Sequence, residues 1–164
     1  GVNLREGEVA SPSPGEKITC IRSGQAGGPF IFELELAPGS GSPPTHTHDE
    51  GDETIEILEG EMGWRVNGKK LHMKTGDKMT LTPADAHTFW NASKTQVLRA
   101  RVTHGARFER LIAQPNLTAV LMYLVYVDPG ASRSSSPLMN AAVRVAAWVG
   151  KLRGVKPVVE QLDG

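Results

Sequence analysis

The first part of the chain alternates between hydrophobic and polar positions with a period of two. Phe30, Phe32, Leu34 and Leu36 occupy every second position of one segment. This spacing is typical of a β-strand with one buried face, because successive side chains point to opposite sides of a strand. Similar short segments follow, and we expect further strands over residues 45–48, 53–59, 61–67, 69–74, 78–82, 86–91 and 96–103. Residues 18–104 are therefore predicted to form an all-β unit.

Turn residues separate these predicted strands. Asn67-Gly68 lies between two of them and is a strong hairpin signal, because a type I′ turn needs positive φ at both central residues. Glu59-Gly60 and Gly76-Asp77 separate other segments. Short strands spaced by such turns are typical of a sandwich, a jelly roll or a small barrel.

Beyond residue 105 the hydrophobic spacing becomes helical. It predicts a helix over residues 106–114, which Pro115 ends, and a second over 115–127, for which a buried strand remains an alternative. Pro137 suits the first position of a helix that continues to residue 152. Residues 131–136 are rich in serine and predict a flexible linker.

The pattern predicts three parts. They are an extended arm over residues 1–17, a barrel over 18–105 and a helical extension over 106–164. Because an isolated extension would leave its apolar surface exposed, we expect it to pack on the barrel or on a partner subunit, as a lid or as a dimer contact.

Composition excludes several classes of function. The 164 residues include 18 Lys and Arg and 18 Asp and Glu, so the chain lacks the basic excess of a nucleic-acid-binding protein. The single cysteine, Cys20, excludes an intrachain disulfide and a zinc site built from several cysteines. The apolar run over residues 117–127 is shorter than the roughly 20 residues of a membrane span. With no apolar leader in view, we expect a soluble, cytoplasmic protein.

Histidines carry the candidate chemistry. His46 and His48 are two residues apart, so on a strand both imidazoles lie on one face and can converge on one ion. Glu53 begins the next predicted strand, on the same face as Ile55 and Ile57. A carboxylate among apolar side chains is tolerated when it is paired or bound to a metal.

A second candidate segment contains His87. On a strand, His87 shares a face with Phe89 and Asn91, and the segment follows Gly76 and Pro83. The remaining histidines, His72 and His104, lie outside both segments, and we interpret them as ordinary surface or core residues. Asp52, in the acidic run before the strand, is the alternative to Glu53 as a ligand, although strand parity favours Glu53.

The two segments together resemble the cupin superfamily. Its first motif contains HxH, then three or four residues, a Glu, six more residues and a Gly, and His46, His48, Glu53 and Gly60 match this spacing. Its second motif is matched by Gly76, Pro83, His87 and Asn91. The second match departs by one residue on either side of the proline, and Asp85 stands where many relatives have glycine. These departures concern the shape of the turn.

The resemblance implies a fold and a metal site. The fold is a mainly β, double-stranded β-helix or jelly-roll barrel of two antiparallel sheets, here followed by C-terminal α-helices. His46, His48, Glu53 and His87 would hold one divalent transition metal, and three imidazoles with one carboxylate suit Fe, Mn, Ni, Co, Cu or Zn. Barrels of this family commonly pair, so we also expect a homodimer.

The resemblance further implies an enzyme that acts on a small molecule. The leading hypothesis is dioxygenase-type oxidation of an apolar or enolisable substrate, with Glu53 as a general base. The alternatives are a non-redox, metal-assisted isomerase, cyclase or lyase, and a cupin that binds a small ligand without turnover.

The substrate pocket is predicted from strand faces. Arg99 and Arg101 share a face that is either solvated or an anchor for an anionic or enolate substrate. Trp64 lies on a strand whose inward face parity alone does not decide. The candidate lining residues are Ile55, Ile57, Trp64, Phe89, Arg99 and Arg101.

Overall fold

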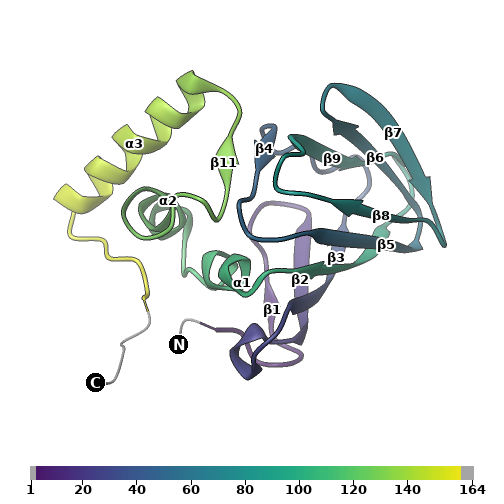
Figure 1. Ribbon diagram of the computed structural model, residues 1–164, viewed down its shortest axis with the longest axis horizontal. Coiled ribbons are helices and arrows are strands. Elements are labelled where there is room, and N and C mark those ends of the chain that lie inside the picture. Colours follow the sequence, from purple (N-terminus) through teal and green to yellow (C-terminus); the bar gives the residue numbers. More distant parts are fainter. Residues whose placement is uncertain (1–2, 160–164) are drawn as a thin grey trace.

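The computed structural model describes residues 3–159 and contains two antiparallel β-sheets that face each other, with helices to one side (Figure 1). Within these residues, the first sheet has the order β1 (Val9–Ala10), β2 (Glu16–Arg22), β3 (Phe30–Leu36), β10 (Leu98–His104), β5 (Glu53–Glu59) and β8 (Lys78–Leu81). The second has the order β11 (Arg133–Ser134), β4 (His46–Thr47), β9 (His87–Asn91), β6 (Glu61–Val66) and β7 (Lys69–Lys74). This mainly β jelly roll with C-terminal helices confirms the predicted fold class.

The core lies between the two sheets. On β3 the alternating residues Phe30, Phe32, Leu34 and Leu36 are all buried, as their spacing predicts. Trp64 on β6 is 1% exposed, which shows that the face shared by Met62 and Trp64 points inward. Each fully buried side chain of this size contributes about 1.5–3 kcal/mol of transfer free energy, so the core is the main source of the stability that holds the strands in place.

The predicted hairpin is confirmed and also supports the second histidine segment. Asn67 and Gly68 have φ of 49° and 81°, as a type I′ turn requires, and they join β6 to β7. The Asn67 side chain donates to Asp85 Oδ1 at 2.8 Å and accepts from Ala86 N at 3.0 Å. These bonds fix the loop that immediately precedes His87.

The C-terminal helices are α1 (Ala106–Ile112), α2 (Leu117–Tyr126) and α3 (Pro137–Leu152). The second helix begins after Pro115, because Asn116 caps it by accepting a hydrogen bond from Ala119 N at 2.9 Å. Ser136 caps α3, and Pro137 takes its first position as predicted. None of the helices within residues 3–159 combines the length and apolarity that crossing a membrane requires.

The segment predicted as a flexible linker is ordered against the barrel. Ala131 is 2% exposed, and β11 pairs with β4 so that Arg133 lies opposite Thr47 and Ser134 opposite His46. The prediction was wrong because local composition does not reveal a distant strand edge. By pairing with β4, this segment satisfies backbone groups of β4 that would otherwise lie at the edge of the sheet.

Candidate metal centre

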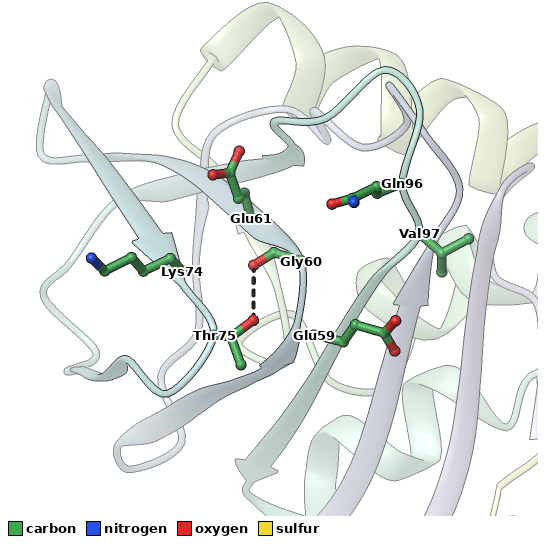
Figure 2. Close-up of a pocket in the computed structure, with 7 residues that line it drawn as sticks. All are labelled: Glu59, Gly60, Glu61, Lys74, Thr75, Gln96 and Val97. Atoms are coloured by element: carbon green, nitrogen blue, oxygen red, sulfur yellow. Dashed lines mark hydrogen bonds between the residues drawn. The ribbon is translucent and has the colours of Figure 1, made fainter.

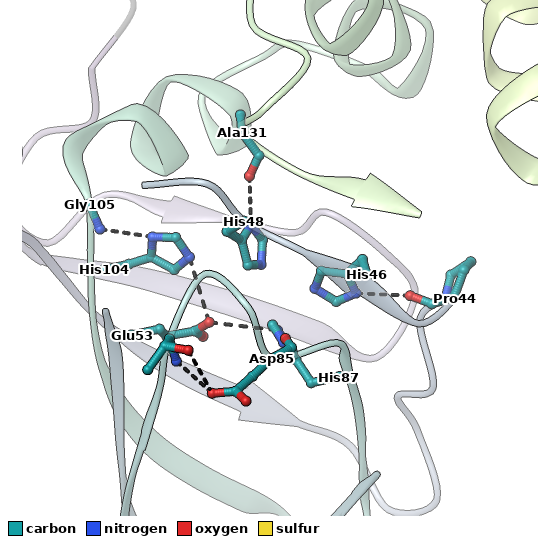
Figure 3. Close-up of polar contacts among 10 residues, drawn as sticks. Pro44, His46, His48, Glu53, Asp85, His87, His104, Gly105 and Ala131 are labelled. Carbon is teal, nitrogen blue, oxygen red and sulfur yellow. Dashed lines mark hydrogen bonds and ion pairs between the residues drawn. The ribbon is translucent and has the colours of Figure 1, made fainter. Parts of the chain in front are cut away.

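Three predicted ligands meet inside the barrel. His46 on β4 lies opposite His87 on β9 in the strand register, and their ring centroids are 4.5 Å apart. His48, just beyond β4, has its ring centroid 4.8 Å from that of His46 and 5.4 Å from that of His87. One ligand atom from each of these three residues lies within 4.8 Å of the others. Figure 3 shows the three rings converging from the two strands.

The outer nitrogen of each ring is anchored on a backbone carbonyl. Nδ1 lies 2.8 Å from the Pro44 oxygen in His46, 2.5 Å from the Ala131 oxygen in His48, and 2.8 Å from the Asp85 oxygen in His87. A carbonyl oxygen only accepts, so each Nδ1 carries the hydrogen and each Nε2 keeps a free lone pair. This is the tautomer through which histidine binds metals when a second partner holds the ring.

Burial keeps these rings neutral. Removal from water is the main cause that lowers the pKa of His46 to about 3 and that of His48 to about 4, and the neighbouring imidazoles add to the effect. Burial also lowers the pKa of His87. Neutral imidazole is the form that binds a metal, so the cluster presents its lone pairs without competition from protons near neutral pH.

Glu53 stands at the start of β5 with one oxygen aimed at the histidines. Its Oε2 lies 3.7 Å from His87 Nε2 and 3.7 Å from His104 Nε2, and within the described residues it has no hydrogen-bond partner. Burial raises the pKa of Glu53 to about 7. A carboxylate oxygen facing the lone pair of His87 is favourable only with a proton or a cation between them, so these residues fit a divalent metal.

The structure groups the ligand atoms in two overlapping sets. His46, His48 and His87 form the first set, and His48, Glu53 and His104 form the second. Asp52, the alternative to Glu53, is exposed and belongs to neither set within the described residues. Ligation of one ion by His46, His48, Glu53 and His87 together stays a prediction.

His104 is the site residue that the motif comparison missed. It is the last residue of β10 and is 2% exposed, with its ring stacked on Phe108 at 4.2 Å and edge-on to His48 at 4.7 Å. The alternation of side chains along β10 could have predicted that His104 points inward. His104 follows Val102 and Ala100 on the inward face of β10, where both are buried.

A small cavity lies beside the histidines. Its volume is ≈ 40 Å³, and its lining includes Ile55, Trp64 and Phe89 together with the three clustered histidines and Glu53. The Trp64 Nε1 has no hydrogen-bond partner within residues 3–159. Ile57, also predicted to line the pocket, is buried in the core and is not part of this lining.

The structure does not bring Arg99 and Arg101 to this cavity. Both alternate with the inward residues of β10 and form ion pairs with Glu33, at 3.3 Å and 3.2 Å, on the outer face of the sheet. Arg99 also pairs with Glu59 at 3.5 Å. These two arginines therefore lie on a solvated face of the barrel, and they do not line the cavity as anchors for a substrate.

The C-terminal extension holds the loop that follows the HxH segment. Arg107 pairs through Nη1 with Asp49 at 2.7 Å and through Nε with Asp128 at 2.8 Å, and its backbone N–H donates to the Glu50 carboxylate at 2.9 Å. Gly130 accepts a hydrogen bond from Asp49 N at 3.0 Å. The acidic residues beside the histidines are thus partners of the extension.

A larger surface hollow, of ≈ 680 Å³, lies at the turn between β5 and β6. Figure 2 shows its lining, in which the Thr75 hydroxyl donates to the Gly60 carbonyl at 3.5 Å. None of the described histidines belongs to this lining. The histidine cluster is therefore the stronger candidate for the functional site, despite its smaller cavity.

Comparison with known proteins identifies a domain of a known family in this chain. Residues 32–102 match the model of the cupin domain family. The chain is 31% identical over 62 residues to the tetracenomycin polyketide synthase protein TcmJ of Streptomyces glaucescens, a match that covers 38% of this chain and 41% of that protein.

Solved structures with the same fold include the following two. Hydroxypropylphosphonic acid epoxidase from S. wedmorenis has a TM-score of 0.52 and 18% identity, covering 59% of this chain and 54% of its own. KdgF from Halomonas sp. has a TM-score of 0.50 and 14% identity, covering 62% of this chain and 90% of its own. The motif spacing, the two-sheet barrel and the family match agree that residues 32–102 of this chain form a cupin domain.

Proposed function

We propose that this chain is a metal-dependent enzyme that moves a proton on a small, enolisable organic substrate. The observation that carries the proposal is the arrangement of three imidazoles whose Nδ1 atoms are anchored on carbonyls and whose Nε2 lone pairs converge, beside the buried Glu53. His46, His48, His87 and Glu53 would hold the ion.

Each residue has a definite part in this proposal. A divalent transition metal, drawn from Fe, Mn, Ni, Co, Cu or Zn, supplies Lewis acidity toward a carbonyl oxygen. Glu53 is the general base, because its Oε2 faces the clustered histidines and, with no ion beside it, burial raises its pKa to about 7. The apolar lining residues Ile55, Trp64 and Phe89 exclude water from the proton that moves.

The substrate class follows from the lining and from the curated relative. The lining favours a molecule with an apolar body, and the small cavity requires side chains to move when it enters, because ≈ 40 Å³ holds about one water. The relative is named as a polyketide synthase protein, and polyketides carry enolisable carbonyls. Since the match covers 41% of that protein, the shared substrate class is a proposal.

Dioxygenase-type oxidation is the second candidate. The observation that favours it is the donor set itself, because three imidazoles and one carboxylate suit iron as well as zinc. Both candidates need the substrate beside the ion, and they differ in whether O₂ is consumed.

One experiment tests the proposal. The full chain is stripped of metal, reloaded with single divalent metals and given a panel of 1,3-diketones and enediols. We expect metal-dependent exchange of the substrate C–H for deuterium without O₂ uptake, retained by His72→Ala and lost in Glu53→Gln. Metal-dependent O₂ uptake would instead establish the dioxygenase. Tight ligand binding with neither activity would show a binding protein.

The predicted homodimer stays a prediction. In the single chain, α3 exposes large apolar side chains, with Leu138 at 81%, Val145 at 61% and Leu152 at 67%. Sedimentation of the full chain measures the oligomeric state directly.

A further inference from the structure

His104 presents its Nε2 to the site in a different tautomer from that of His46, His48 and His87. Its Nδ1 lies 2.8 Å from the backbone N of Gly105, and a backbone N–H only donates, so Nδ1 must hold a lone pair. A neutral ring with a lone pair on Nδ1 carries its hydrogen on Nε2. The atom of His104 that faces the site is therefore a hydrogen-bond donor, whereas His46, His48 and His87 present lone pairs.

The donor of His104 faces an acceptor that lacks a partner. His104 Nε2 lies 3.7 Å from Glu53 Oε2, and within the described residues neither atom has a hydrogen-bond partner. Both residues point toward each other across the site in Figure 3. A small rotation of the carboxylate brings the two atoms within hydrogen-bond distance, which is at most about 3.2 Å for a good N–H···O bond.

Packing fixes the His104 ring in this orientation. The ring stacks on Phe108 with centroids 4.2 Å apart and planes 17° apart, and it meets His48 edge-on at 4.7 Å. If His104 bound a metal through Nε2, its hydrogen would have to move to Nδ1. The Gly105 N–H would then lose its acceptor.

We propose that His104 is a positioning residue that donates its Nε2–H to the Glu53 carboxylate and is not a metal ligand. The inference deepens the proposed function and rests on its assignment of Glu53 to the ion. The hydrogen bond occupies one lone pair of Oε2 and holds the carboxylate in place. The remaining lone pairs stay available to the ion and to the proton that Glu53 transfers.

The tautomers can be measured directly on the metal-free full chain. Long-range ¹H–¹⁵N NMR correlations of the imidazole rings distinguish a hydrogen on Nδ1 from one on Nε2. We expect His104 in the Nε2–H form and His46, His48 and His87 in the Nδ1–H form. A His104 ring with its hydrogen on Nδ1 would overturn the proposal, whatever the protein binds.

Titration with Co²⁺ alone tests the positioning role. His104→Phe keeps the stacked ring and removes the donor, so we expect Co²⁺ to bind 10–100-fold more weakly, the usual cost of losing a partner that orients a ligand. The ligand-field absorption of the bound Co²⁺ should keep its wild-type form. His104→Gln restores an N–H donor and should recover most of the affinity, and His72→Phe, at an exposed histidine, should change nothing.

The outcomes separate the two claims. A wild-type chain that binds no Co²⁺ would refute the metal site of the proposed function, while the NMR tautomers still decide which nitrogen of His104 carries the hydrogen. A wild-type chain that binds Co²⁺, with a His104→Phe spectrum showing one imidazole fewer, would make His104 a ligand and overturn the positioning role. Unchanged affinity in His104→Phe would overturn it as well.

Discussion

The two flanks of the histidine cluster are held by different parts of the chain. On the barrel flank, Glu53 begins β5, which is paired on both sides by β10 and β8, and His87 begins β9, which lies between β4 and β6. On the tail flank, His46 begins the two-residue strand β4 and His48 follows it. The outer neighbour of β4 is β11 of the C-terminal extension.

This difference shows which part of the site the cupin domain builds alone. The family match ends at residue 102, yet the carbonyl that orients His48 belongs to Ala131, which lies 83 residues after His48 and outside the match. The motif supplies the candidate ligands of both flanks, whereas the orientation of the tail flank depends on a segment outside the matched domain. The extension therefore helps to orient one histidine of the cluster.

The largest effect is expected from removing a ligand on either flank. His87→Ala and His46→Ala each delete a lone pair that converges on the ion, so stoichiometric metal binding should be lost from both variants. The loss should exceed the roughly 10–100-fold cost of deleting a supporting partner. Calorimetric titration with Zn²⁺ measures it, with His72→Ala as the control. If either variant kept the full metal affinity, the histidine on that flank would not be a metal ligand.

The pH dependence of the metal-free chain should also be large. The unfolded histidines titrate near pH 6.5, whereas burial lowers the folded pKa values to about 3 for His46, 4 for His48 and 2 for His104. Below pH 6.5 the unfolded state therefore binds more protons, and stability falls as the pH falls. Glu53 has the opposite effect, because burial raises its pKa to about 7 and the folded state therefore binds more protons at this carboxyl than the unfolded state does. It offsets the contribution of about one histidine to the pH dependence.

The net expectation is a loss on the order of 3 kcal/mol of unfolding free energy per pH unit between pH 6 and about 4.5. Urea denaturation in the presence of a chelator measures this slope. His48→Phe removes one tail-flank group and should flatten the slope by about 1.4 kcal/mol per pH unit. A free energy of unfolding that is constant from pH 7 to pH 5 would contradict the buried, neutral cluster.

A moderate effect is expected from loosening the tail flank alone. Arg107→Met removes the ion pairs to Asp49 and Asp128 while all ligands remain. Metal affinity should fall about 10–100-fold, because His48 loses part of its support. The loss of unfolding free energy should be near 1 kcal/mol, since the Arg107 side chain is 36% exposed.

Arg101→Met is the matched control for this variant. It removes an arginine–glutamate pair of similar exposure on the outer face of the barrel, so its metal affinity should equal that of the wild type. Equal affinities for Arg107→Met and Arg101→Met would show that the extension does not support the site.

The smallest effect is expected at the outer face of β10. Arg99→Gln breaks surface pairs with Glu33 and Glu59 and should cost no more than about 1 kcal/mol of unfolding free energy. Metal affinity and substrate exchange should be unchanged, because the side chain lies away from the cavity. A loss of substrate exchange without a loss of metal affinity would show that Arg99 contributes to the substrate site.

Local patterns predicted most of the barrel. The alternation from Phe30 to Leu36 and the turn residues Asn67-Gly68 each determine their structure within a few residues, and both predictions were confirmed. The start of α3 at Pro137 was predicted for the same reason. The motif also selected His46, His48 and His87, which the structure brings together.

Contacts between distant segments could not be predicted in this way. The pairing of β11 with β4 leaves no trace in the serine-rich composition of residues 131–136, because the partner strand lies far earlier in the chain. His104 lay outside the motif, although its parity with Val102 pointed inward. The same alternation places Arg101 on the outer face. For the residues of β10, strand alternation therefore predicts the position relative to the site, which the motif spacing does not.

Anomalous diffraction at the metal edge, from crystals of the full chain grown with a divalent transition metal, tests the central claim most directly. The account predicts one strong peak per chain, about 2.0–2.2 Å from the Nε2 atoms of His46, His48 and His87 and from one oxygen of Glu53. It also predicts that His104 Nε2 lies outside bonding distance of that peak. A strong peak away from these residues, or none at saturating metal, would contradict the assignment of this cluster as a metal centre.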